Sequence, residues 1–106
     1  MRVLFDQGTP VPLRQLLVGH EVSTAYECGW STLKNGELLA AAEAQAFEVL
    51  VTTDKNLKYQ QNLASRSIAV VVLGTTSWPR IRAAAETVVT AVHSASPGTY
   101  TEVAVP

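Results

Sequence analysis

The sequence predicts a single α/β domain, a three-layer α/β/α sandwich built around a central, mainly parallel sheet. Segments typical of strands alternate along the chain with segments typical of helices, which is the pattern of strands connected by helices. The segments at 49–52 and 68–73 are almost continuously apolar, as strands are when helices cover both faces of a sheet. The chain has 106 residues, 47% of them hydrophobic, which is enough for one core, so we place residues 1–106 in one domain.

The first third of the chain is expected to hold two strands with a helix between them. A strand at 2–5 ends at Asp6. The helix that follows begins after Thr9, whose side chain we expect to cap it, has two prolines in its first turn, and ends near Gly19. A weaker strand at 20–24 completes this part of the chain.

The middle of the chain is expected to contain a long loop and the strongest helix. Residues 25–36 have turn residues and no clear period, which predicts a long loop, a kind of segment that is often functional in a small domain. An alanine-rich helix at 37–47 follows, and then a strand at 49–52. The segment 49–63 turns polar at Asp54, and its second half predicts a short helix.

The last third of the chain is expected to contain a strand at 68–73 and an amphipathic helix that starts at Ser77 and ends before Pro97. The apolar face of this helix is formed by Ile81, Ala84, Ala85, Val88 and Val92. We expect the core to span about residues 1–93, and the tail 94–106 to form an edge strand or to contact a partner chain.

Composition argues against two classes of protein. The formal net charge is −1, without the basic excess that non-specific nucleic-acid binders carry. The longest wholly apolar run, at 68–73, is too short to cross a bilayer, and the first strand meets Asp6 too early for a secretion signal. The single cysteine, Cys28, allows no internal disulfide. We therefore expect a cytoplasmic protein without a membrane segment.

Two acidic residues follow two of the predicted strands. Asp6 ends the first strand, and Asp54 lies just beyond the central one. Ligands of open α/β sheets bind in the crevice beyond the carboxyl ends of the strands, so these two carboxylates are the main functional candidates. Each also has an ordinary structural interpretation, Asp6 as a turn former and Asp54 as the first residue of an Asx-turn. Thr52 and Thr53 are placed to contact phosphate or to orient Asp54.

Four short motifs in a fixed order give the chain a family resemblance. Residues 4–10 read LFDQGTP, residues 19–22 GHEV, residues 35–42 NGELLAAA and residues 49–57 VLVTTDKNL. With these motifs the chain resembles the PIN-like proteins, specifically the compact DUF5615-type branch related to the toxin ribonucleases of bacterial toxin–antitoxin pairs. The resemblance covers roughly residues 2–73.

The resemblance implies a metal-dependent endoribonuclease, the toxin component of a toxin–antitoxin system. Asp6 and Asp54 would be metal ligands, with Glu37 as a candidate third ligand and Asn56 assisting catalysis. Mg²⁺ or Mn²⁺ suits such a site because these cations prefer oxygen and need few carboxylates when water and substrate phosphate complete the shell. A bound cation also relieves repulsion between neighbouring carboxylates and can orient water for attack on a phosphodiester. The implied partners are an RNA substrate, a cognate antitoxin protein and, commonly, a second copy of the chain.

The chain departs from the family pattern at three positions where an acid is usual. Gln7, Asn35 and Asn56 are amides, which bring oxygen but no charge. Glu37 and Asn56 can also be read as a first-turn acid and a helix cap. The alternative function is therefore a catalytically weakened PIN-like module that binds a protein partner or RNA. A receiver domain also places acids at strand ends, but it is disfavoured because it needs an acidic pair where this chain has only Asp6.

Trp30 and Trp78 are the aromatic residues that we considered for stacking a nucleobase. Packing under a loop is the more common role of such residues, and we expect it for both. His20 and His93 show no spacing that suggests a metal pair, and we expect them at the surface.

Overall fold

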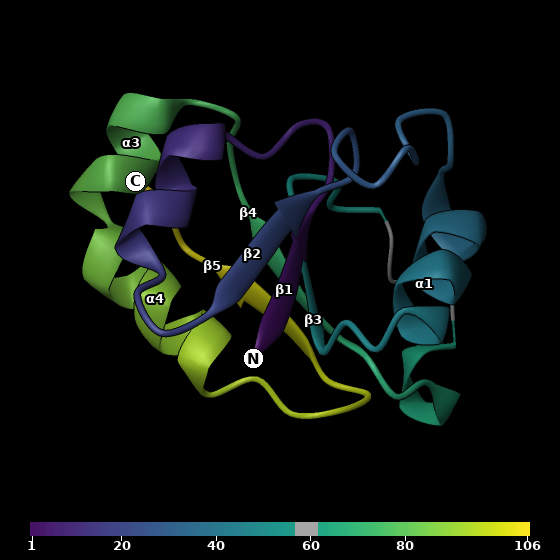
Figure 1. Ribbon diagram of the computed structural model, residues 1–106. Coiled ribbons are helices and arrows are strands. Elements are labelled where there is room, and N and C mark those ends of the chain that lie inside the picture. Colours follow the sequence, from purple (N-terminus) through teal and green to yellow (C-terminus); the bar gives the residue numbers. More distant parts are fainter. Residues whose placement is uncertain (57–61) are drawn as a thin grey trace.

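The computed structural model describes residues 1–56 and 62–106, and within them five strands form one all-parallel sheet (Figure 1). The strands lie in the order β2–β1–β3–β4–β5. They are β1 (Arg2–Phe5), β2 (Glu21–Thr24), β3 (Val49–Thr52), β4 (Ala69–Leu73) and β5 (Tyr100–Val103). Each predicted strand is present, and the C-terminal tail forms an edge strand beside β4.

Helices cover both faces of the sheet (Figure 1). On one side lie the 3₁₀ helix η1 (Val11–Leu16), α3 (Trp78–Ala83) and α4 (Ala85–His93). On the other side lie α1 (Asn35–Ala44) and the 3₁₀ helix η2 (Leu63–Ser65). The fold is therefore an α/β sandwich of three layers, as the continuously apolar central strands predict.

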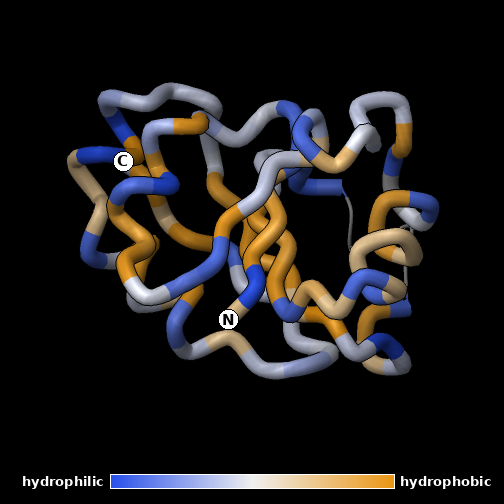
Figure 2. The backbone as a smooth tube through the Cα atoms, viewed as in Figure 1, coloured by the Kyte–Doolittle hydropathy of each residue, from blue (hydrophilic) through white to orange (hydrophobic). Residues whose placement is uncertain are grey.

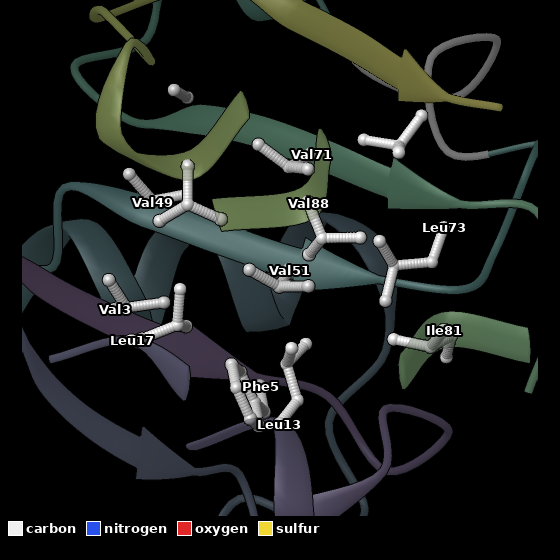
Figure 3. Packing of buried hydrophobic residues seen from close by; sticks show 13 residues of the cluster. Val3, Phe5, Leu13, Leu17, Val49, Val51, Val71, Leu73, Ile81 and Val88 are labelled. Carbon is white, nitrogen blue, oxygen red and sulfur yellow. The ribbon is translucent and has the colours of Figure 1, made fainter. Parts of the chain in front are cut away.

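The strands supply side chains to two apolar clusters, one on each face of the sheet. In β1, Val3 and Phe5 join the cluster under η1, α3 and α4, and Leu4 joins the cluster under α1, which is the alternation of a β-strand. Figure 3 shows the first cluster, where Phe5 lies beside Leu13 of η1. The apolar stretches of the chain meet in the middle of the molecule (Figure 2). Phe5 and Leu4 are fully buried, and each such burial stabilises the fold by about 1.5–3 kcal/mol.

The strand order creates a switch point at β1. From β1 the chain crosses to β2 on one side, and it then returns past β1 to β3 on the other side. Phe5 at the end of β1 lies opposite Val51 of β3 in the register. The carboxyl ends of β1 and β3 therefore lie side by side, at the place where open α/β sheets bind their ligands.

Two helices differ from the sequence prediction at their ends. The first is a 3₁₀ helix with Pro10 at its cap position, so the prediction that Thr9 caps it is wrong. Thr9 is buried instead. α1 ends at Ala44 rather than at residue 47, because Ala46 has a φ of 62° and the chain then turns Phe47 into the core.

The predicted C-terminal helix is divided in two at Ala84, whose φ of −103° and ψ of 21° interrupt the helical conformation. Ile81, Val88 and Val92 are fully buried, so the predicted apolar face does pack on the sheet. Ser77 stands at the cap position of α3, but its side chain makes no capping hydrogen bond.

The short helix expected in the second half of segment 49–63 falls largely on residues 57–61, which lie outside the described part of the chain. Across residues 1–56 and 62–106, none of the helices has the length and apolar character needed to cross a membrane.

Candidate functional site

The two predicted acids, Asp6 and Asp54, line one pocket at the carboxyl ends of β1 and β3. We call it the switch-point pocket. It has a volume of about 190 Å³ and is open to solvent. Its described lining residues are Asp6, Gln7, Leu33, Lys34, Leu38, Leu50, Thr52 and Asp54. The pocket is therefore built from the ends of two strands, the loop before α1 and the first turns of that helix.

The carboxylate of Asp6 is held by donors from three residues. Oδ1 accepts hydrogen bonds from the Gly8 backbone N–H (3.2 Å) and the Thr9 hydroxyl (2.8 Å). Oδ2 accepts a hydrogen bond from the Thr52 hydroxyl. Because donors reach both oxygens from different elements, the orientation of this carboxylate in the pocket is fixed. The turn-former interpretation of Asp6 is thus correct, and it is compatible with a place in the pocket.

Thr9 has a structural role that the sequence did not reveal. Its side chain is buried, and its hydroxyl lies 2.8 Å from Asp6 Oδ1 and 2.9 Å from the backbone carbonyl of Val51. The hydroxyl has one proton, which these two acceptors share. Thr9 therefore ties the chain after β1 to β3 beneath the pocket.

Asp54 is held by a turn of its own. Its Oδ1 accepts a hydrogen bond from the Asn56 backbone N–H (2.9 Å), the arrangement of an Asx-turn. Its backbone N–H donates to Thr52 Oγ1 (3.0 Å). Since the same Thr52 hydroxyl donates to Asp6, this one buried side chain connects the two acids. Thr52 therefore contacts the backbone of Asp54, whereas the Asp54 carboxylate is held by Asn56.

The long loop at 25–34 closes one side of the pocket. The side-chain amide of Gln7 donates a hydrogen bond to the backbone carbonyl of Ser31 and so attaches this loop to the end of β1. Lys34, at the cap position of α1, is exposed and lines the pocket, so a cationic side chain stands near the two acids. The amide at Gln7, where the resemblance expects an acid, is thus used to fix the loop.

Glu37 and Asn56 lie outside the lining of the switch-point pocket. Glu37 is exposed in the first turn of α1, where an acid complements the helix dipole. Asn56 is exposed, and its backbone N–H is the group that Asp54 uses. In residues 1–56 and 62–106, no group of three or more His, Cys, Asp and Glu side chains is arranged to hold a metal ion. The described part of the pocket therefore offers two carboxylates, not three.

The two tryptophans pack against the fold, as expected. The Trp30 ring meets Phe47 edge to face with 6.0 Å between the ring centroids, and Trp78, the first residue of α3, packs against the core. Among the described residues, Tyr26 is an aromatic residue exposed near the site, with 80% of its surface accessible. The sequence signal that could have found it is its place two residues after the end of β2, at the same edge of the sheet as the acids.

His20 and His93 meet each other, although their spacing suggested no pair. Their rings lie edge to face with 5.9 Å between centroids, at the opposite end of β1 from the pocket. Partial burial, followed by the nearby terminal amine and His93, lowers the pKa of His20. This contact is separate from the switch-point pocket.

Comparisons of the chain with protein-family models, with curated proteins and with solved structures found no match.

Proposed function

We propose that this chain is a PIN-like, metal-dependent endoribonuclease, acting in the cytoplasm as the toxin component of a toxin–antitoxin pair. The observation that carries the proposal is the meeting of Asp6 and Asp54 in one pocket at the switch point of the sheet. The order of four sequence motifs supports it independently. The substrate would be RNA, and the implied protein partners are a cognate antitoxin and a second copy of the chain.

The carboxylate oxygens that line the pocket are suitable ligands for one hydrated Mg²⁺ or Mn²⁺ ion. Mg²⁺ keeps several waters and binds through one or two carboxylates together with substrate phosphates. The pocket supplies two carboxylates, whose positions the Thr52 hydroxyl helps to fix. When bound, the ion would supply a polarised water for attack on phosphorus and charge to stabilise the leaving oxygen. With two carboxylates among the described residues rather than three or four, we expect weak metal affinity.

The chain's own residues would position the reacting groups. Asp6 is held by donors on both of its oxygens, so it needs little rearrangement to present an oxygen to the pocket. Asp54 is fixed by its Asx-turn. The Lys34 ammonium at the pocket wall would attract the anionic backbone of a nucleic acid, because opposite charges at short range attract even near solvent.

A second candidate is a PIN-like module that binds RNA or a protein partner without cutting. The observation that favours it concerns Gln7 and Asn56, the amide residues at positions where the family pattern has an acid. Gln7 fixes the loop to Ser31, and the side chain of Asn56 lies outside the pocket lining, so neither replaces the missing acid.

The test is RNA cleavage by purified protein with Mg²⁺, with Mn²⁺ and with EDTA. We expect cleavage that requires metal and is lost in both Asp6→Asn and Asp54→Asn. Glu86→Gln, which removes the same charge from an exposed position in α4, is the control and is expected to cleave like the parent. Cleavage that persists in EDTA, or in both aspartate variants, would contradict the nuclease proposal. An intact protein that folds by circular dichroism but does not cleave would favour the binding module.

A further inference from the structure

We propose that a groove next to the switch-point pocket binds an unpaired nucleobase of the RNA, stacked on the ring of Tyr26. This inference rests on the proposed function and extends it by assigning a site for the nucleotide beside the scissile phosphate. The groove has a volume of about 490 Å³. Its lining includes Asp6, Gln7, Val11, Arg14, Tyr26 and Glu27.

The groove adjoins the switch-point pocket. Asp6 and Gln7 line both hollows, so they form a shared wall between them. A polynucleotide whose phosphate lies at Asp6 and Asp54 would therefore have a neighbouring base within reach of the groove. Asp54 and Lys34 lie on one side of this wall, and Tyr26 lies on the other.

Hydrogen bonds fix the backbone next to Tyr26, whereas the residue itself is largely exposed to solvent. The neighbouring Ala25 is buried, its N–H donates to the Phe5 carbonyl (2.8 Å), and its carbonyl accepts from the Trp30 N–H (2.8 Å). The Tyr26 side chain nevertheless remains 80% exposed, and Val11 across the groove is 54% exposed. An exposed aromatic ring on a fixed backbone is a suitable platform for stacking, since every base presents a π-face.

The charges of the groove favour a base over a phosphate. The Arg14 guanidinium is paired with Glu27 at 2.5 Å, so its charge is balanced within the groove. The hydrogen bond from Arg14, followed by that from the Thr24 backbone, lowers the pKa of Glu27, and the carboxylate therefore stays ionised at neutral pH. Asp6 adds negative charge on the shared wall. An uncharged, flat group fits this surface better than an anion does.

The experiment measures binding of a fluorescein-labelled single-stranded hexanucleotide RNA by fluorescence anisotropy, with Ca²⁺ in place of Mg²⁺ or Mn²⁺ so that an oxygen-binding cation is present at the acids while cleavage is suppressed. We expect Tyr26→Ala to raise the Kd about 10-fold, the loss typical of one stacked base, and Tyr26→Phe to stay within about twofold of the parent. Val18→Ala is the control, because Val18 is 86% exposed but does not line the groove. A hexanucleotide with abasic sites should bind the parent about as weakly as it binds Tyr26→Ala.

Equal Kd values for the parent and Tyr26→Ala, or for the intact and abasic RNA, would overturn the inference. A parent protein that binds no RNA would also overturn the inference. If that protein is a dimer in sedimentation experiments and Tyr26→Ala dissociates it, the groove is instead a contact between two copies of the chain. Different results would refute the nuclease proposal and the proposed base site. Stacking on Tyr26 without metal-dependent cleavage would refute only the nuclease, and cleavage with the same KM in Tyr26→Ala would refute only the base site.

Discussion

At the scale of single residues, Thr52 is the side chain that joins the two acids. Its hydroxyl donates to Asp6 and accepts from the Asp54 backbone N–H, and it is 1% exposed. Thr52→Val keeps the shape but leaves both partners without this bond. We expect a loss of about 1–2 kcal/mol in the free energy of unfolding, measured by urea denaturation. Thr90→Val, the same change at an exposed position of α4, should cost less than half of that. Equal losses in the two variants would contradict the role of Thr52.

Gly8 is needed because the chain after Asp6 passes close to Thr53. A Cβ at Gly8 would lie 2.5 Å from Thr53 Oγ1, while the next nearest atoms lie at 3.8 Å. Gly8→Ala should therefore destabilise the protein by about 1–2 kcal/mol. In a Thr53→Ala background the crowded atom is gone, and we expect most of the cost to disappear. A cost of Gly8→Ala that is the same in both backgrounds would show that the contact is unimportant.

The sequence identified Asp6 and Asp54 because each lies within two residues of the end of an apolar strand, and the carboxyl ends of parallel strands lie at one edge. It placed Glu37 less well, since the direction of a side chain depends on where its helix begins and how it rotates. The helix begins at Asn35, and this puts Leu38 rather than Glu37 in the pocket lining. The contribution of Lys34 depends on how the preceding loop folds, and no short-range pattern encodes that.

At the scale of elements, the attachment of α1 to the chain before β4 depends on Glu43. Its carboxylate accepts hydrogen bonds from the Ser67 N–H (2.9 Å) and hydroxyl (3.0 Å) and pairs with Arg66 at 2.5 Å. Burial alone would raise the pKa of Glu43, but these donors together hold it below its ordinary value of 4.5.

Because the folded-state pKa of Glu43 is lowered, its stabilising contribution is present above about pH 4.5 and is lost as the pH falls through the folded-state value. Glu43→Gln should reduce the free energy of unfolding by about 1 kcal/mol at pH 7, and this difference should shrink below pH 4.5. Urea denaturation between pH 3 and pH 7 measures it, with Glu86→Gln as the charge-matched control. A difference that is independent of pH would contradict the assignment.

The element pattern was predictable because strand and helix periods are local, whereas element ends depend on tertiary contacts. α1 stops at Ala44 so that Phe47 can enter the core, and the C-terminal helix breaks at Ala84 while both of its halves pack on the sheet. The predicted cap at Thr9 failed for a similar reason. The buried carbonyl of Val51 and the carboxylate of Asp6 use its hydroxyl instead.

At the scale of the whole molecule, strand order decides where the candidate site lies. The alternation of strands and helices predicts a parallel sheet but not which strands are neighbours. The order β2–β1–β3–β4–β5 places β1 against β3, and only this adjacency brings two acids 48 positions apart in the sequence into one pocket. The sequence therefore predicts the three layers and identifies the two acids, whereas the order of the strands brings the acids into one pocket.

We propose that Asp6 and Asp54 form one metal-binding site, and paramagnetic broadening by Mn²⁺ tests this proposal most directly. In two-dimensional ¹H–¹⁵N spectra of the intact protein, we expect substoichiometric Mn²⁺ to broaden first the amide signals of residues 6–9 and 52–56, and EDTA to restore them. Asp54→Asn should remove the effect. No broadening there, or broadening confined to the surroundings of His20 and His93, would contradict the account.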